Sequence, residues 1–214
     1  SIEMGSLGNG ADFGDLSAVR GRGASLSSTT RSVFAGGETY TAPAYNRHNN
    51  IEYVTITTAE EAPDFGNLDA ARSGLAGGSS ATRGFFAGGH TGSYTNLIDY
   101  ITIASTGDAT DFGDLSSATY SNTGAASGTR GISAGGYAPS VTDVIDYITI
   151  ASTGDASDFG DLLAATRATA GTAGLTRGLF GGGYAPARHN VIQYITIATT
   201  GDAADFGDLS AARA

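Results

Sequence analysis

One short pattern, Asp-Phe-Gly-x-Leu, recurs along the chain and constrains its fold more than any other feature. Successive copies start 52, 47, 47 and 47 residues apart. In each interval a double glycine follows the start of the preceding copy by 24 residues, and an Arg precedes that double glycine by five. An Ile-x-Tyr triplet starts 13 residues before the next copy. A period of about 20–50 residues indicates a solenoid or a propeller. The copies begin at Asp12, Asp64, Asp111, Asp158 and Asp205.

Each repeat reads as four short strands separated by turn signals. In the third full repeat these are residues 121–127, 130–136, 144–151 and 158–162. The third of these strands is apolar on both faces, which is typical of a strand covered on two sides. Propeller blades provide such cover, because each blade packs between two others.

We therefore predict an all-β propeller of about five four-stranded blades in a single domain, residues 1–214. Residues 1–16 align with the last two strands of a repeat, and residues 210–214 with the start of a first strand. We expect these two ends to form a partial blade. The ring would then close through both termini; the alternatives are closure through another chain, or a chain that is a fragment of a longer repeat array. The predicted full units are 17–68, 69–115, 116–162 and 163–209.

The order of the markers resembles the kelch repeat. In kelch blades an innermost strand precedes a strand that ends in Gly-Gly, a strand with a Tyr and an outer strand with a Trp. Gly135-Gly136 matches the double glycine and Tyr147 the tyrosine, while Asp158-Phe159 stands at the place of the Trp, which this chain lacks. The wording YITIASTGDATDFGDL also resembles repeats of virion structural and tail-associated proteins of marine tailed phages. These resemblances imply a propeller located on a virion or an extracellular surface.

The distribution of charged residues limits the classes of binding partner that we expect. The net charge is −10, and all eleven basic residues are Arg. Binding to nucleic acid or to anionic membranes relies on clustered positive charge, so we expect neither nucleic acid nor membrane insertion. No apolar run approaches the roughly 18 residues that span a bilayer. The chain has no Cys, which excludes disulfides and thiolate metal sites.

The DFG tripeptide is also the magnesium-binding signature of protein kinases, but here it has a structural interpretation. A kinase uses one such Asp together with a strand Lys, whereas this chain has five copies and no Lys. We expect a bulge at Gly113 to turn both Phe112 and Leu115 inward. Asp111 is then expected to accept backbone hydrogen bonds in the preceding turn. Arg130, or its counterpart in the next blade, is expected to pair with a repeated Asp.

Calcium binding is an open alternative for the acidic turns. The stretch DATDFGD supplies Asp108, Asp111 and Asp114, but their spacing fits no EF-hand loop. The last position is Asn67 in an earlier repeat. We therefore predict turn capping rather than a metal site, and no cofactor.

No catalytic motif is present, so we predict that the chain is not an enzyme. There is no GxSxG, HExxH, P-loop or dinucleotide fingerprint. The three His residues occur singly, each in a loop between the second and third strands of a repeat.

These loops are the candidate binding surface, because they vary while the scaffold repeats. Tyr, Arg and His are favoured in protein interfaces, and Tyr also stacks on sugars. In kelch propellers these loops share one face with the connections between blades. The alternative interpretation is that Tyr137-Ala138-Pro139 and Tyr184-Ala185-Pro186 only stabilise turns. We expect a structural or attachment protein that binds protein partners within a larger assembly or oligomer, or a lectin-like protein that binds a surface glycan. The candidate residues are Tyr45, Arg47, His48, His90, Tyr94, Tyr137, Tyr184, Arg188 and His189.

Overall fold

The computed structural model describes residues 10–214 and contains four antiparallel sheets of four strands each, together with a two-stranded ribbon. The predicted all-β propeller architecture is confirmed, and the described residues contain four complete four-stranded blades where about five were predicted. In this part of the chain no helix is long and apolar enough to cross a membrane. The first sheet contains β1 (Ala24–Ser27), β2 (Arg31–Ala35), β5 (Asn50–Thr55) and β6 (Asp64–Asn67), and the ribbon contains β3 (Glu38–Thr41) and β4 (Ala44–Arg47). The second contains β7 (Ala76–Ser79), β8 (Arg83–Ala87), β9 (Thr95–Thr102) and β10 (Thr110–Thr119). The third contains β11 (Thr123–Ala126), β12 (Arg130–Tyr137), β13 (Val141–Thr149) and β14 (Ser157–Asp161), and the fourth β15 (Ala170–Ala173), β16 (Arg177–Gly181), β17 (His189–Thr196) and β18 (Ala204–Arg213).

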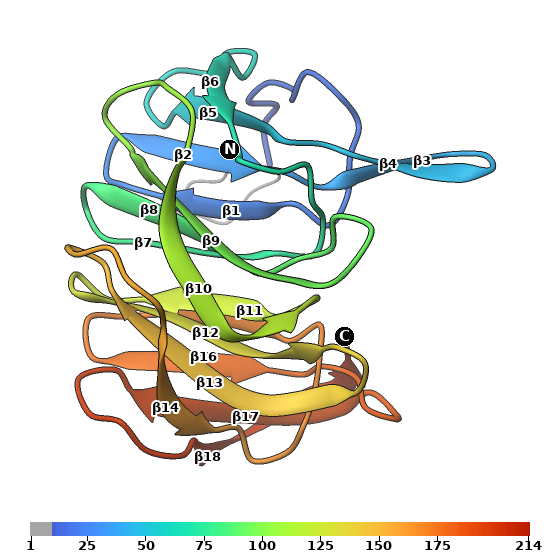
Figure 1. The fold of residues 1–214 in the computed structure, drawn as a ribbon, viewed down its shortest axis with the longest axis vertical. Coiled ribbons are helices and arrows are strands. Elements are labelled where there is room, and N and C mark those ends of the chain that lie inside the picture. Colours follow the sequence, from blue (N-terminus) through green and yellow to red (C-terminus); the bar gives the residue numbers. More distant parts are fainter. Residues whose placement is uncertain (1–9) are drawn as a thin grey trace.

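The sheets follow one another in chain order, from blue to red in Figure 1. Their first strands contact each other in the order β1, β7, β11 and β15. They line an open pocket of about 460 Å³, which we call the channel. Small residues make this approach possible. A Cβ on Gly124 would lie 2.2 Å from the carbonyl oxygen of Gly77 in the preceding sheet. The high glycine content therefore serves the contact between neighbouring blades as well as the turns.

Each hydrophobic cluster spans two neighbouring sheets. Phe159 and Leu162 of the third sheet pack with Ile195, Ile197 and Ala203 of the fourth. Equivalent clusters join the first sheet to the second and the second to the third. We call the side of a sheet that faces the following sheet its trailing face, and the opposite side its leading face.

The DFG pattern connects one blade to the next. The strand register shifts between Asp111 and Gly113, and both Phe112 and Leu115 are buried, as expected. Gly113 has a φ of 139°, and a Cβ there would lie 2.6 Å from the backbone of Gly154 in the following sheet. The Gly154 N–H donates to the Phe112 carbonyl at 2.7 Å. The outer strand therefore docks on the next blade through its backbone as well as its side chains.

Two expected side-chain pairings are wrong. Asp111 accepts from the Gly113 N–H in its own strand at 3.2 Å, not from the preceding turn. Arg130 does not pair with an Asp; it donates to the Ile197 carbonyl of the next sheet at 2.9 Å and lies 4.5 Å from the ring centroid of Tyr147. The carbonyl is available because it ends the third strand of the next repeat. The same carbonyl contact is made by Arg31 with Ile103 and by Arg83 with Ile150.

Each sheet also buries one polar acceptor that orders the connection preceding it. Asp146 accepts from the N–H and the hydroxyl of Ser116, at 3.0 and 2.9 Å. Burial raises the pKa of Asp146, although the hydrogen bonds from Ser116 oppose this shift. The equivalent acceptors are Glu52, Asp99 and Gln193, which accept from the N–H groups of Ser17, Asp69 and Leu163.

The two chain ends differ from each other. Asp12–Leu16 lie against the leading face of the first sheet, where the Ala62 N–H donates to the Asp15 carbonyl at 3.0 Å. This copy therefore occupies the place of an outer strand from a preceding blade. Residues 1–9 of the predicted partial blade lie outside the described residues. Residues 210–213 do not begin a new first strand, because they continue β18, where Arg213 is opposite His189.

Candidate functional site

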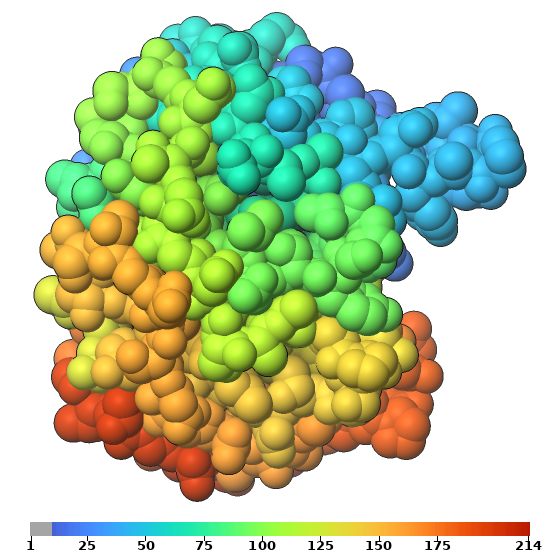
Figure 2. All heavy atoms as spheres, in the orientation of Figure 1, coloured from blue at the N-terminus to red at the C-terminus, as the bar shows by residue number. Residues whose placement is uncertain are grey.

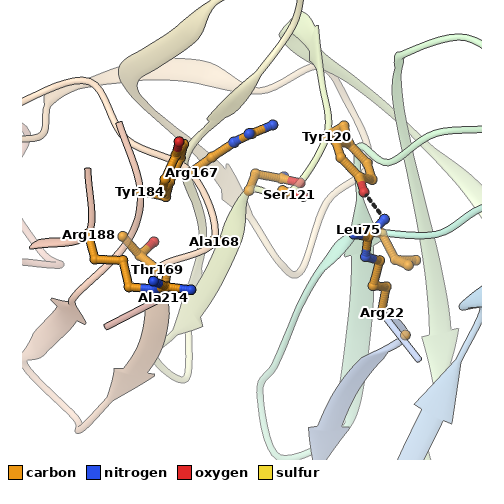
Figure 3. A pocket seen from close by; sticks show the side chains of 13 residues that line it. Arg22, Leu75, Tyr120, Ser121, Arg167, Ala168, Thr169, Tyr184, Arg188 and Ala214 are labelled. Atoms are coloured by element: carbon orange, nitrogen blue, oxygen red, sulfur yellow. Dashed lines mark hydrogen bonds between the residues drawn. The ribbon is translucent and has the colours of Figure 1, made fainter. Parts of the chain in front are cut away.

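Two adjoining pockets lie at the end of the channel where the loops between second and third strands emerge. Their volumes are about 590 and 260 Å³, and both are lined by Arg22, Tyr120 and Arg167. We call them together the channel mouth. Figure 3 shows Arg167 and Arg188 on one side of the larger pocket, and Arg22 and Tyr120 on the other, with Ser121 between them.

The double glycines direct the chain toward this mouth. Gly135 and Gly136 have φ values of 62° and 119°, a region that residues with a side chain rarely adopt. A Cβ on Gly135 would lie 2.5 Å from the carbonyl oxygen of Thr166, and the Gly136 N–H donates to that same oxygen at 2.8 Å. Glycine is required here because the second strand has a register shift at this point and contacts the connection that leads to the next blade.

In each blade the residue after the double glycine pairs with a residue from the connection between blades. Tyr120 and Tyr137 exchange two backbone hydrogen bonds of 2.8 and 3.1 Å. The same pairing joins Gly21 to Glu38, Ser73 to His90 and Arg167 to Tyr184. The backbone geometry is therefore constant, while the pair of side chains that it presents differs from one repeat to the next.

A second backbone feature runs around the mouth from blade to blade. The Gly74 N–H donates to the Arg22 carbonyl, the Ser121 N–H to the Gly74 carbonyl, and the Ala168 N–H to the Ser121 carbonyl, at 2.7 to 2.9 Å. All four residues have φ between 55° and 65°. Three of them are not glycine, and such strained residues concentrate at binding and active sites.

Positive charge gathers at the mouth of this acidic chain. The two pockets are lined by four Arg side chains and a single acidic side chain, Glu38. Arg22 donates to Glu38 at 2.9 Å and to the Tyr120 hydroxyl at 2.6 Å. Across residues 10–214, the other three Arg have no carboxylate within ion-pair distance; they are Arg47, Arg167 and Arg188.

Aromatic rings surround His90 in the smaller pocket. The ring centroids of Tyr94 and Tyr120 lie 5.4 and 5.7 Å from that of His90, and Tyr137 lies 5.8 Å from Tyr94. Burial lowers the pKa of His90, and the charge of Arg47 lowers it further. The charge of Glu38 opposes this shift of the His90 pKa.

Seven of the nine residues that the sequence singled out line the mouth. Tyr45, Arg47, His90, Tyr94 and Tyr137 lie in the smaller pocket, and Tyr184 and Arg188 in the larger. His48 and His189 instead hold their own loops: His48 bonds to the Thr39 hydroxyl at 2.8 Å, and His189 to the Ala185 carbonyl at 2.9 Å. The binding role of all nine stays a prediction.

The sequence interpretation missed the residues that come from the connections between blades. These are Arg22, Tyr120, Ser121 and Arg167, none of which belongs to a repeated motif. The signal that points to them is their position: they occupy two adjacent positions of the repeat, at which the residue type differs between repeats.

The first repeat adds a projecting arm beside the mouth. Its additional residues form the ribbon of β3 and β4, which extends away from the sheets in Figure 1 and from the molecular surface in Figure 2. Tyr40 and Tyr45 are opposite one another in this ribbon, with ring centroids 4.9 Å apart. Both rings are more than half exposed.

The acidic turns make backbone contacts between blades. Asp108 accepts from the Asn67 N–H at 2.9 Å, and Asp155 accepts from the Asp114 N–H at 3.0 Å. Within residues 10–214 no three His, Asp or Glu side chains gather in a way that would hold a metal ion. Of the three carboxylates considered for calcium, those of Asp108 and Asp111 thus accept backbone hydrogen bonds.

Comparison with known proteins shows similarity in fold but no match in sequence. No protein-family model matches the sequence, and a search of curated proteins gave no match. Among solved structures, the chain is similar to YjhT, a kelch-type β-propeller, with a TM-score of 0.72 and 10% sequence identity. The similarity covers 91% of this chain and 72% of YjhT. At this identity it shows the propeller fold alone.

Proposed function

We propose that this chain is a non-enzymatic binding propeller that acts as a virion or surface component and attaches to its partner through the channel mouth. One observation carries this proposal. The backbone positions around the mouth repeat from blade to blade, while the pairs of side chains at these positions differ. A repeated scaffold that presents varied side chains is typical of a recognition surface.

The polar groups at the mouth support binding rather than catalysis. The Ser73 hydroxyl donates to Glu38, which also accepts from Arg22. His90 makes ring contacts with Tyr94 and Tyr120. Among the described residues no histidine side chain hydrogen-bonds to the Ser73 hydroxyl, so the serine–histidine pair of a typical nucleophilic site is not formed.

A lectin-like function is the second candidate, and the exposed tyrosines favour it. Tyr45, Tyr94 and Tyr184 line the mouth, and their side chains are 55%, 37% and 40% exposed. A tyrosine ring offers an apolar face and a polar tip, which together suit the apolar and hydroxyl-bearing sides of a sugar ring.

Glycan-array binding by the native protein and by two variants tests the site. We expect Tyr137→Ala combined with Tyr184→Ala to reduce binding at least tenfold, because each truncation removes a ring that stacks on Arg167. Phe206→Ala is the control, since this aromatic ring is 54% exposed and lies outside both pockets. The lectin candidate is rejected if no glycan binds at high protein concentration.

The attachment role has a separate test in the native source. A virion or surface component is expected to sediment with a particle much larger than its own 21.4 kDa. Recovery of the protein as free monomer alone contradicts the structural role.

A further inference from the structure

Arg167 lies where the two pockets of the mouth meet, and its surroundings favour a planar anion. The guanidinium carbon is 4.9 Å from the ring centroid of Tyr137 and 5.4 Å from that of Tyr184. Within residues 10–214 its side-chain N–H groups donate no hydrogen bond and face no carboxylate in ion-pair distance. Stacking on two rings fixes the guanidinium plane and leaves its N–H edge available for a bidentate bond to a carboxylate.

The rest of the mouth adds to this preference. Glu38 already accepts from Arg22 and from the Ser73 hydroxyl, at 2.9 and 2.7 Å. The buried Nε of Arg47 has no hydrogen-bond partner among the described residues. The mouth therefore holds uncompensated positive charge on a chain whose net charge is −10. Such a local reversal of sign selects an anion for this site over other parts of the surface.

We propose that the channel mouth binds a carboxylated glycan, with the carboxylate on Arg167 and a sugar ring against Tyr184. This inference rests on the proposed binding function and names the chemistry of its ligand. Arg188 and Arg22 face the same pocket from opposite sides and are placed to attract an acidic sugar (Figure 3). The exposed tyrosine ring favours a sugar over an acidic peptide, because it offers a flat apolar surface beside the charged group.

Matched oligosaccharides test the inference on the full chain. The two oligosaccharides of a pair differ in a single sugar unit, which is a hexose in the neutral member and the corresponding hexuronic acid in the acidic member. A short poly-glutamate peptide is the third probe. We expect the acidic oligosaccharide to bind at least tenfold more tightly than its neutral partner. The preference should weaken as the salt concentration rises, because salt screens charges at a partly open site.

Two variants connect the preference to Arg167. Arg167→Gln is expected to abolish the at least tenfold advantage of the acidic sugar, and Arg167→Lys to recover only part of it, because Lys keeps the charge and loses the planar fork. Arg177→Gln makes the same change in net charge outside both pockets and should keep the advantage.

The outcomes separate this inference from the proposed function. Equal binding of neutral and acidic sugars, lost in the Tyr137 and Tyr184 double variant, overturns the carboxylate preference and keeps the binding function. Binding of poly-glutamate alone overturns the glycan as ligand. Retention of the acidic preference by Arg167→Gln overturns the role of that residue.

Discussion

At the scale of single residues, one buried position shows how the repeats tolerate charge. Glu52 and Asp99 each form an ion pair with a buried Arg, Arg20 and Arg72. In the last two repeats Thr replaces that Arg, at Thr119 and Thr166. The fourth repeat then uses the neutral Gln193, whereas the third keeps Asp146 without a cationic partner. A buried carboxylate without a partner is costly when ionised.

Asp146→Asn is therefore expected to make the protein more stable at pH 7. Burial raises the pKa of Asp146 above the usual Asp value of 3.8, so the folded state binds its proton more tightly than the unfolded state does. The contribution of this group to stability is then greatest at low pH and is lost as the pH rises through the folded pKa. Asn keeps an oxygen acceptor for Ser116 and has no such loss.

Urea unfolding of both proteins as a function of pH checks this expectation. The stability advantage of Asp146→Asn should shrink as the pH falls toward 3.8. The assignment is contradicted if the variant is less stable than the parent at pH 7 and gains relative to it on acidification. Gln193→Ala is not a suitable control, because it removes the acceptor for the Leu163 N–H.

At the scale of the element, the outer strand combines a bulge with a close backbone approach. Gly113 and Gly207 have the same φ of 139° in equivalent strands. A Cβ on Gly113 would meet the Gly154 backbone at 2.6 Å, whereas one on Gly207 would meet nothing within 4 Å. A side chain at Gly207 would therefore cost only the strain of a positive φ. A side chain at Gly113 would cost that strain and would also collide with the next blade.

Alanine at each position measures these two effects. We expect Gly207→Ala to cost about 1–3 kcal/mol of unfolding free energy, from backbone strain alone. Gly113→Ala should cost roughly 2 kcal/mol more, because it also forces two blades apart. Equal losses in urea unfolding experiments would show that the approach of the next blade is not what requires glycine.

The spacing of glycines and apolar residues was enough to predict such elements. The repeat positioned all four strands of the third blade, and the offset of Phe112 and Leu115 indicated the bulge. The partners of Arg130 and Asp111 were not predicted correctly. Arg130 donates to a backbone carbonyl 67 residues away in the next sheet. Every residue has such a carbonyl, so the sequence does not indicate which one is the partner. Arg22 and Arg167 were missed because their connections carry no motif.

At the scale of the whole molecule, three similar interfaces join four sheets, and the trailing face of the fourth sheet is more open than the others. Phe159 is 2% exposed, whereas its equivalent Phe206 is 54% exposed. Both rings pack edge-on against a tyrosine of their own sheet, Tyr147 and Tyr194, with centroids 5.9 and 6.0 Å apart. The ring contact within the sheet is thus the same for Phe159 and Phe206. Their exposed fractions differ because a following blade covers Phe159.

The central claim is that the DFGDL strand stabilises this protein by docking on the next blade. Measurement of the unfolding free energies of Phe159→Ala and Phe206→Ala tests it most directly. We predict a loss of about 3–5 kcal/mol for Phe159→Ala, the usual cost of truncating a fully buried phenylalanine, and about 1 kcal/mol for Phe206→Ala. Equal losses at the two positions would contradict the claim, because the ring would then contribute mainly within its own sheet.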